Sequence, residues 1–313
     1  MKKTMTFFIV LSALCFGANA EYSDLDNALR ATYMNCVGID DALHDMKVKA
    51  GINTAVTGVG TGLGVGAVAT GIAKSNVDKE LEQKFEELRD LTYIARAEQE
   101  EATGDRFKAR VKQRLYNLPK SETSDEQNQK RQQLIEKSKK LGDWRTGLLA
   151  GNTATNIAGA AIAGTNKVNQ SLHEQIDNCK MSVKDLKNAI ARAKFNGEDV
   201  SEAKEIADVC GNFEYVDLGK IDKRATGGMA SSIVGAGTGV VGTITSALAN
   251  SNKIRNDDTI NGQQKEKNLN TSANVFAVGS TVASATATIF NAAQIKAIKD
   301  VAEIASKCTE VLK

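Results

Sequence analysis

The sequence predicts an all-α fold, and three observations support this prediction. Four long segments carry no charged residue, small residues recur inside them every four positions, and the flanking apolar residues recur at alternating spacings of four and three. A spacing of four keeps one face of an α-helix smooth, and a 4-3 alternation is the heptad pattern of a seam between helices. We therefore expect long helices packed along their lengths.

The composition excludes several classes of protein. The chain has 313 residues, with 26 Gly, one Pro, 42% hydrophobic residues and 5% aromatic residues. Plentiful Gly with almost no Pro does not fit collagen-like or Pro-rich chains, and the hydrophobic fraction is too high for a wholly disordered chain. A formal net charge of +2 gives no basic surface of the kind that binds nucleic acid.

Residues 1–20 are predicted to be a secretory signal peptide. Lys2 and Lys3 form its basic start, and residues 5–17 are an apolar stretch too short for a good membrane span. The small-x-small motif that ends at Ala20 predicts cleavage before Glu21. Loss of the two lysines leaves a formally neutral mature chain. We expect export to a bacterial periplasm or cell envelope.

The four charge-free runs are the main feature of the mature chain. They cover 50–73, 146–166, 225–252 and 268–295, with lengths of 24, 21, 28 and 28 residues, and they hold 18 of the 26 glycines. Lys or Arg bounds each run at both ends. A β-strand interpretation suits only the alternating stretch 58–66, because the runs are longer than ordinary strands.

Nine glycines of these runs are predicted to pack against neighbouring helices. They are Gly58, Gly62, Gly66, Gly147, Gly151, Gly159, Gly235, Gly239 and Gly279. Segments such as Gly58-Val-Gly-Thr-Gly62-Leu-Gly-Val-Gly66 resemble the glycine-zipper proteins of bacterial envelopes. The resemblance is one of motif, and it implies close helix packing at or near a membrane rather than an activity.

The runs form two similar pairs, which indicates an internal duplication. The segment Gly58-Val-Gly-Thr-Gly62-Leu corresponds to Gly235-Ala-Gly-Thr-Gly239-Val. We expect one Gly/Ala-rich helical hairpin in 21–200 and a second in 201–313. In the first hairpin, residues 74–145 are dense in charge of both signs and predict a charged helical or coiled-coil extension. Such charges favour a solvated face, and partner binding is the alternative.

The four cysteines of the mature chain lie outside the runs at matching distances. Cys36 and Cys210 precede the first and third runs by 14 and 15 residues, while Cys179 and Cys308 each follow a run by 13. Residues equally far from the tip of an antiparallel hairpin face one another. The spacing therefore predicts the disulfides Cys36–Cys179 and Cys210–Cys308 in an exported chain. The other two connectivities and four reduced cysteines are the alternatives.

The runs are long enough to cross a membrane, but their polarity opposes insertion. About 20 helical residues span a bilayer. Asn53, Asn152, Asn156, Asn274 and Asn291 lie inside the runs and lower their hydropathy. A soluble periplasmic bundle is therefore favoured, with stable membrane spans or insertion after export as the alternatives.

The motifs present do not indicate catalysis. Residues 237–242 match G-x-G-x-x-G, but they belong to a small-residue run that follows no predicted strand. His44 and His173 are the only histidines, and they lack the spacing of metal ligands. We expect a protein that is not an enzyme and uses no cofactor, metal or small-molecule substrate.

The expected function is helix–helix packing in scaffolding or assembly. The expected partner is a second copy of the chain or an envelope protein, bound through the small-residue helices or the 74–145 extension. The alternative is a membrane-inserting, oligomeric pore former or effector that uses the glycine-zipper hairpins.

Overall fold

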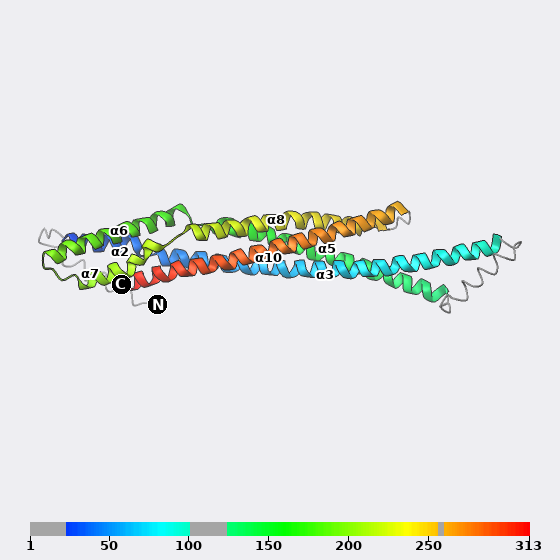
Figure 1. Ribbon diagram of the computed structural model, residues 1–313, viewed down its shortest axis with the longest axis horizontal. Helices are drawn as coiled ribbons and strands as arrows, with labels where there is room; N and C mark the ends of the chain where they lie inside the picture. Colours follow the sequence, from blue (N-terminus) through cyan, green and yellow to red (C-terminus); the bar gives the residue numbers. More distant parts are fainter. Residues whose placement is uncertain (1–22, 101–123, 256–259) are drawn as a thin grey trace, which may run out of the picture. The chain divides into compact units, whose positions relative to one another are not determined.

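The computed structural model describes residues 23–100, 124–255 and 260–313, and every regular element in these ranges is a helix. The helices are α2 (Asp24–Cys36), α3 (Ile39–Glu100), α5 (Ser124–Thr165), α6 (Gln170–Phe195), α7 (Ser201–Cys210), the 3-10 helix η1 (Gly211–Tyr215), α8 (Gly219–Ala249), α9 (Asn252–Arg255) and α10 (Ile260–Val311) (Figure 1). The all-α prediction is confirmed for these residues. The predicted signal peptide, with its cleavage site between Ala20 and Glu21, and the centre of the 74–145 extension lie outside them.

The chain divides into two compact units, and each takes segments from both halves of the sequence. Unit 1 contains Met1–Lys47, Val168–Ile221 and Lys296–Lys313, and unit 2 contains Val48–Lys167 and Asp222–Ile295. This division differs from the sequential units 21–200 and 201–313. The charge-free runs gather in unit 2, and the segments that carry Cys36, Cys179, Cys210 and Cys308 gather in unit 1. The internal duplication stays a prediction.

Local sequence signals begin and end the helices of unit 1. Ser23 caps α2, where its side chain accepts a hydrogen bond from the Asp26 backbone N–H at 3.1 Å. Asn169 caps α6 in the same way through the Leu172 N–H at 2.7 Å. Gly38 separates α2 from α3 with a φ of +91°, which residues other than glycine rarely adopt.

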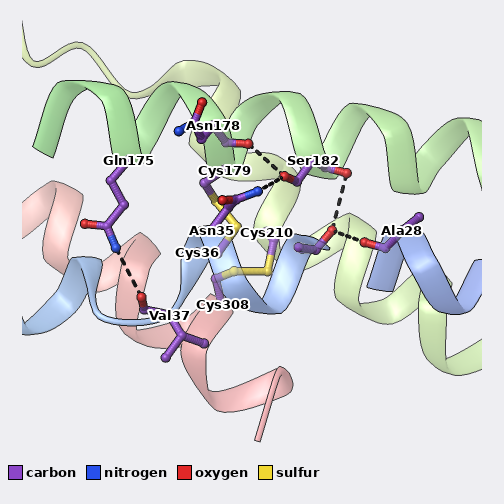
Figure 2. Close-up of a disulfide and its surroundings, with 11 residues drawn as sticks. Ala28, Asn35, Cys36, Val37, Gln175, Asn178, Cys179, Ser182, Cys210 and Cys308 are labelled. Carbon is purple, nitrogen blue, oxygen red and sulfur yellow. Dashed lines mark hydrogen bonds between the residues drawn. A yellow bond between two sulfur atoms is a disulfide. The ribbon is translucent and has the colours of Figure 1, made fainter. Parts of the chain in front are cut away.

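Unit 1 has a conventional apolar core. On α6 the buried side chains include Leu172, Ile176, Val183 and Leu186, at the heptad spacing seen in the sequence. Helix α2 lies along this face, where Asn35 Nδ2 donates to Ser182 Oγ at 2.6 Å (Figure 2). Burial of these apolar side chains supplies the main stabilisation of the unit.

Two disulfides close unit 1, and they are the pairs expected from the spacing. Cys36 is bonded to Cys179 and Cys210 to Cys308, with all four cysteines fully buried. Figure 2 shows the two bonds close to one another. The bonded residues are 143 and 98 positions apart in the sequence.

Reduction of the disulfides is expected to weaken unit 1 strongly. Loops of this length stabilise the folded state by about 4–5 kcal/mol per bond in the chain-entropy model. Thermal unfolding followed by circular dichroism, with and without a reductant, measures the effect. Intact mass provides the matching assay: each bond lowers the mass by two hydrogens. Four free thiols in the unreduced exported protein would contradict the pairing.

Candidate functional site

Unit 2 is a bundle of four long helices whose buried residues follow a 4-3 spacing on each helix. Segments of α3, α5, α8 and α10 run side by side in Figure 1. The buried positions at this spacing include Asn53, Thr57, Gly60, Gly64, Ala67, Gly71 and Lys74 on α3; Ser138, Gly142, Arg145, Leu149, Asn152, Asn156, Gly159, Ala163 and Asn166 on α5; Ala225, Gly228, Ser232, Gly235, Gly239, Gly242, Ser246 and Ala249 on α8; and Ala273, Ala277, Ser280, Ser284, Ala287, Asn291 and Gln294 on α10. We call this set the polar seam. It combines a 4-3 spacing of buried positions with small and polar side chains.

The centre of the polar seam is a hydrogen-bonded network between α5 and α10. Asn156 Nδ2 donates to Asn152 Oδ1 at 2.9 Å and to Ser284 Oγ at 2.8 Å. Asn152 Nδ2 donates to Ser280 Oγ at 2.9 Å, and Ser280 Oγ donates to the Gly235 carbonyl of α8 at 2.8 Å. Buried polar groups are tolerated when they are paired in this way.

One apolar layer interrupts the polar seam. Ala67, Leu149 and Ala277 are fully buried together, with Val68 and Leu148 packed against them. This layer lies between the asparagine–serine network and a group of charged residues, because Leu149 stands one turn from Asn152 on one side and one turn from Arg145 on the other.

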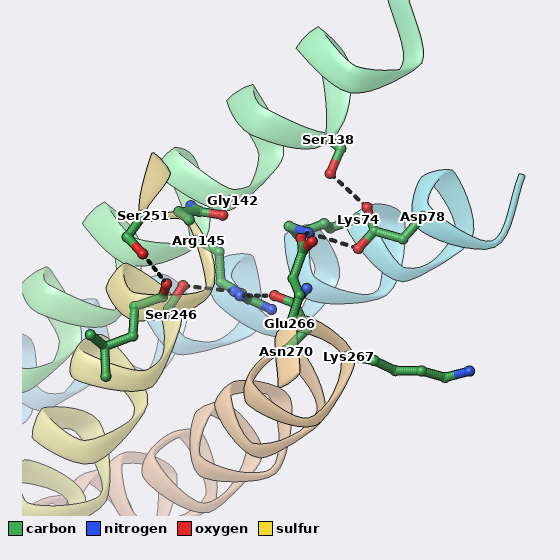
Figure 3. Close-up of polar contacts among 12 residues, drawn as sticks. Lys74, Asp78, Ser138, Gly142, Arg145, Ser246, Ser251, Glu266, Lys267 and Asn270 are labelled. Carbon is green, nitrogen blue, oxygen red and sulfur yellow. Dashed lines mark hydrogen bonds and ion pairs between the residues drawn. The ribbon is translucent and has the colours of Figure 1, made fainter. Parts of the chain in front are cut away.

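Arg145 is buried inside the bundle and connects three helices. Its side chain is 0% exposed. Nε donates to Ser246 Oγ at 2.9 Å, Nη1 to Asn274 Oδ1 at 3.1 Å and Nη2 to Asn270 Oδ1 at 2.7 Å (Figure 3). The planar guanidinium suits this arrangement, since its donors point in fixed, divergent directions.

Burial also changes the proton affinity of Arg145, which precedes the charge-free run of α5. Desolvation lowers the pKa of Arg145 to about 10, while the nearby carboxylates of Asp78 and Glu266 act in the opposite direction. The guanidinium therefore remains charged at neutral pH. The neighbouring carboxylates offset part of the unfavourable burial of this charge.

Lys74 forms the second half of this charged cluster. It is 1% exposed, and its Nζ lies 2.7 Å from Asp78 Oδ2 and 3.3 Å from Glu266 Oε1 (Figure 3). Ser138 Oγ donates to the other oxygen of Asp78 at 2.6 Å. The cluster contains two cations and two carboxylates, so it is formally neutral and ties α3, α5 and α10 together.

The outward faces of unit 2 are apolar. The exposed large hydrophobic residues are Val48, Ile52, Val59, Val65 and Ile72 on α3, Trp144 and Ile157 on α5, Ile233, Val234, Val240, Val241, Ile244 and Leu248 on α8, and Val275, Val278, Val282, Ile289 and Phe290 on α10. Along its charge-free runs, unit 2 thus buries small and polar side chains and exposes valines and isoleucines, whereas unit 1 buries its large aliphatic side chains. Exposed apolar faces of this extent mark interaction or membrane surfaces.

Six of the nine predicted packing glycines lie against a neighbouring helix. A Cβ would be 2.7 Å from Thr57 Cγ2 at Gly159 and 2.7 Å from Asn156 Oδ1 at Gly235, and at Gly239 it would collide with Thr153. Two others face leucines: Gly66 faces Leu148, and Gly151 faces Leu63. Gly279 is in ordinary contact with Thr238.

The other three predicted packing glycines, Gly58, Gly62 and Gly147, do not pack within the chain. A Cβ at each of them would meet no described atom within 4 Å. On this part of α3, Gly60 and Gly64 approach Thr155 and Thr281 instead. Continuing the 4-3 spacing from Asn53 would have found them.

The dinucleotide-like motif and the two histidines, which the sequence does not support as catalytic or metal-binding residues, all lie on helices. Residues 237–242, which match the dinucleotide motif, lie within the continuous helix α8. His44 is exposed on α3, and His173 lies on α6. Among the described residues, His, Cys, Asp and Glu side chains form no group of three or more that could hold a metal ion.

Comparison of the chain with protein-family models, with curated proteins and with solved structures finds no match.

Proposed function

We propose that unit 2 is a membrane-embedded four-helix bundle that anchors unit 1 at the surface of a bacterial membrane. The observation that carries this proposal is the reversal of polarity: the bundle buries its asparagines and serines and exposes valines and isoleucines. In water this arrangement exposes apolar surface at a high free-energy cost, whereas in lipid the same surface is solvated.

Helix length and composition support this proposal. Three stretches of the described residues are long and apolar enough to cross a bilayer: Asp24–Lys84, Ser201–Ala249 and Asn261–Val311. No more than 33% of each apolar window is buried within the protein. The remaining surface is therefore free to contact lipid.

The polarity of the α5 run is also compatible with a bilayer. Its Asn152 and Asn156 carry hydrogen bonds to α10 inside the bundle. The outward positions of the same run include Ala150, Ala154 and Ile157. Polar side chains satisfied between helices are compatible with membrane spans, and they contribute to helix association there. From the sequence alone, these asparagines favoured a soluble bundle. Because their side chains are paired inside the bundle, they no longer oppose membrane insertion.

The disulfides fit a topology with four spans. Each disulfide joins residues on either side of two charge-free runs. Two crossings return the chain to the same side, so all four cysteines would lie in one compartment, and an oxidising exported side is required for their bonds. Residues 74–145 and 253–267 would then lie on the opposite side.

The role that follows is anchoring and assembly rather than catalysis. Buried charge and hydrogen bonds fix the four helices of unit 2 to one another, and the disulfides fix the helix ends in unit 1. We assign no substrate. The conclusion is a non-enzymatic envelope component that works through helix packing.

The membrane proposal predicts a position-dependent effect of added charge. Val65 and Val282 are 57% and 60% exposed near the middle of their runs. An Asp at the centre of a spanning helix costs about 2.5–3.5 kcal/mol. We expect Val65→Asp combined with Val282→Asp to move the protein out of the membrane pellet after alkaline carbonate extraction, while the wild type stays in the pellet.

Val48→Asp is the matched control for this experiment. Val48 lies on the same helix α3 and is 48% exposed, but it stands between Lys47 and Lys49, outside the run. It should stay in the pellet like the wild type. Full extraction of the wild-type chain by carbonate would contradict the membrane proposal.

Conduction is a second candidate, favoured by the same reversal of polarity. A pore wall needs apolar residues toward lipid and polar residues inward, which describes these helices. Within the single bundle, however, the helices are in close contact at Gly235 and Gly239, which opposes a pore through its centre. Release of a trapped dye from liposomes that contain the purified protein would support the pore function, and intact liposomes with fully inserted protein would exclude it.

A further inference from the structure

The four charge-free runs of unit 2 end at one level, beside the charged cluster. Lys74 and Glu266 border the first and fourth runs, and Lys74 Nζ lies 3.3 Å from Glu266 Oε1 (Figure 3). Gly142 and Asn250 lie near the adjoining ends of the second and third runs, and a Cβ at Gly142 would collide with Asn250. In a membrane-embedded bundle, this level is one boundary between lipid and water.

Helix α5 carries a basic and aromatic face at this level. Lys137, Lys140 and Trp144 are exposed, and they recur at spacings of three and four, which places them on one side of the helix. Trp144 is the only tryptophan of the chain and is 70% exposed. These three side chains line an open hollow of about 530 Å³ together with Gln133, Glu136 and Leu141.

The segment of α5 that forms this hollow has an excess of positive charge. Residues 127–144 contain five basic and two acidic residues. One of the two carboxylates is already paired, since Glu136 Oε1 lies 3.2 Å from Lys140 Nζ. Lys137 and Lys139 are exposed in addition to this pair. The surface beside Trp144 therefore attracts an anionic group.

The same side of α5 becomes smooth once the charge-free run begins. Gly147, Ala150, Ala154 and Ala158 follow Trp144 at spacings of three and four, and all four are exposed. A Cβ at Gly147 would meet no described atom within 4 Å. A strip without long side chains lets an extended hydrocarbon chain make continuous van der Waals contact.

We propose that this face of α5 binds an anionic phospholipid. Its phosphate lies at Lys137 and Lys140, Trp144 lies at the interface, and an acyl chain follows the strip from Gly147 to Ala158. The site rests on the membrane proposal, because it needs a bilayer boundary at this level. Basic residues beside a membrane span attract anionic lipids, and tryptophan favours the headgroup region. A zwitterionic lipid has no net charge to complement the lysines.

Fluorescence of Trp144 tests this site, because no other tryptophan contributes to the signal. The full chain is reconstituted in vesicles of phosphatidylcholine and phosphatidylglycerol, with brominated acyl chains on an equal amount of one lipid or the other. Bromine quenches an indole only at short range. Each basic residue near an anionic membrane surface raises lipid binding about fivefold. We therefore expect brominated phosphatidylglycerol to quench Trp144 several-fold more than brominated phosphatidylcholine.

Lys137→Gln combined with Lys140→Gln should make the two lipids quench Trp144 equally. Lys184→Gln combined with Lys187→Gln is the matched control, because it removes two exposed lysines at the same spacing on α6 of unit 1. This control should keep the preference for phosphatidylglycerol.

Three results would overturn the proposal, and they separate it from the membrane proposal. Equal quenching by both lipids in the wild type would exclude the anionic-lipid site and leave the membrane proposal standing. A preference that survives the loss of Lys137 and Lys140 would exclude these lysines as the headgroup site. Quenching by neither lipid would contradict both proposals, because Trp144 would then lie away from the bilayer.

Discussion

Gly239→Leu is expected to disrupt the bundle of unit 2, while Gly237→Leu leaves it folded. A Cβ at Gly239 would collide with Thr153 and would lie 3.0 Å from Ser280 Oγ, on two different helices. Overpacking of a close helix contact costs about 1–3 kcal/mol or more. Leucine also shifts Ser280, whose hydroxyl bonds to the Gly235 carbonyl at 2.8 Å.

Gly237 provides the matched control because it lies two residues away on the same helix. A Cβ there would meet no described atom within 4 Å. Both substitutions gain helix propensity of up to about 1 kcal/mol, so Gly237→Leu should be neutral or stabilising. Thermal and denaturant unfolding in detergent, followed by circular dichroism, compares the two. Equal stability of the two variants would contradict the polar-seam register.

A matched pair of glycine substitutions on α3 distinguishes the four-residue spacing from the 4-3 spacing. Gly64 belongs to the polar seam, and a Cβ there would collide with Thr281, whereas Gly62 faces open space. Gly64→Leu should destabilise the fold and Gly62→Leu should not. If Gly62→Leu instead changes only the association state, measured by native mass, its outward face contacts a second chain.

Arg145→Met is expected to destabilise unit 2 by about 3 kcal/mol, because it removes a buried charge that is hydrogen-bonded to side chains of α8 and α10. The substitution leaves Ser246, Asn270 and Asn274 without the donors that now bond them at 2.7–3.1 Å. It also leaves Lys74 alone against two carboxylates. Arg145→Lys should fall between methionine and wild type, since a single ammonium reproduces the charge without the divergent guanidinium donors.

Lys140→Met is the control for Arg145. Lys140 lies on the same helix α5 and pairs with Glu136 at 3.2 Å, but its side chain is 72% exposed. Its loss should change the free energy of unfolding by no more than about 0.5 kcal/mol. Denaturant unfolding measures both variants. An Arg145→Met protein as stable as Lys140→Met would show that the charged cluster is dispensable.

Much of the architecture could be predicted from local patterns. The charge-free runs and their small-residue spacing indicated helices, and nearly every residue of the four runs lies on a helix. The equal distances of the cysteines from the runs indicated the pairs Cys36–Cys179 and Cys210–Cys308, which the structure contains. The helix prediction worked because helix periodicity depends on residues near in sequence. The cysteine pairs could be predicted because each cysteine lies at a matching distance from its run, although the bonded residues are 143 and 98 positions apart.

Local patterns could not predict which side of each helical run faces the core of unit 2. Glycine, alanine and threonine occur on every side of these helices, so a four-residue spacing and a 4-3 spacing both fit the sequence. The four-residue spacing selected Gly58, Gly62 and Gly147, where a Cβ would meet no described atom within 4 Å. A rule that buries apolar residues would also have turned the helices inside out, with Val65 and Val282 in the core.

The sequence by itself determined the helices, the lengths of their charge-free runs and the pairing of the four cysteines. Only the tertiary structure decided that the asparagines face inward, because their partners are distant in the chain: Asn152 and Ser280 are 128 residues apart. A buried amide is stable only when such a partner is in place, and its position depends on how all four helices pack.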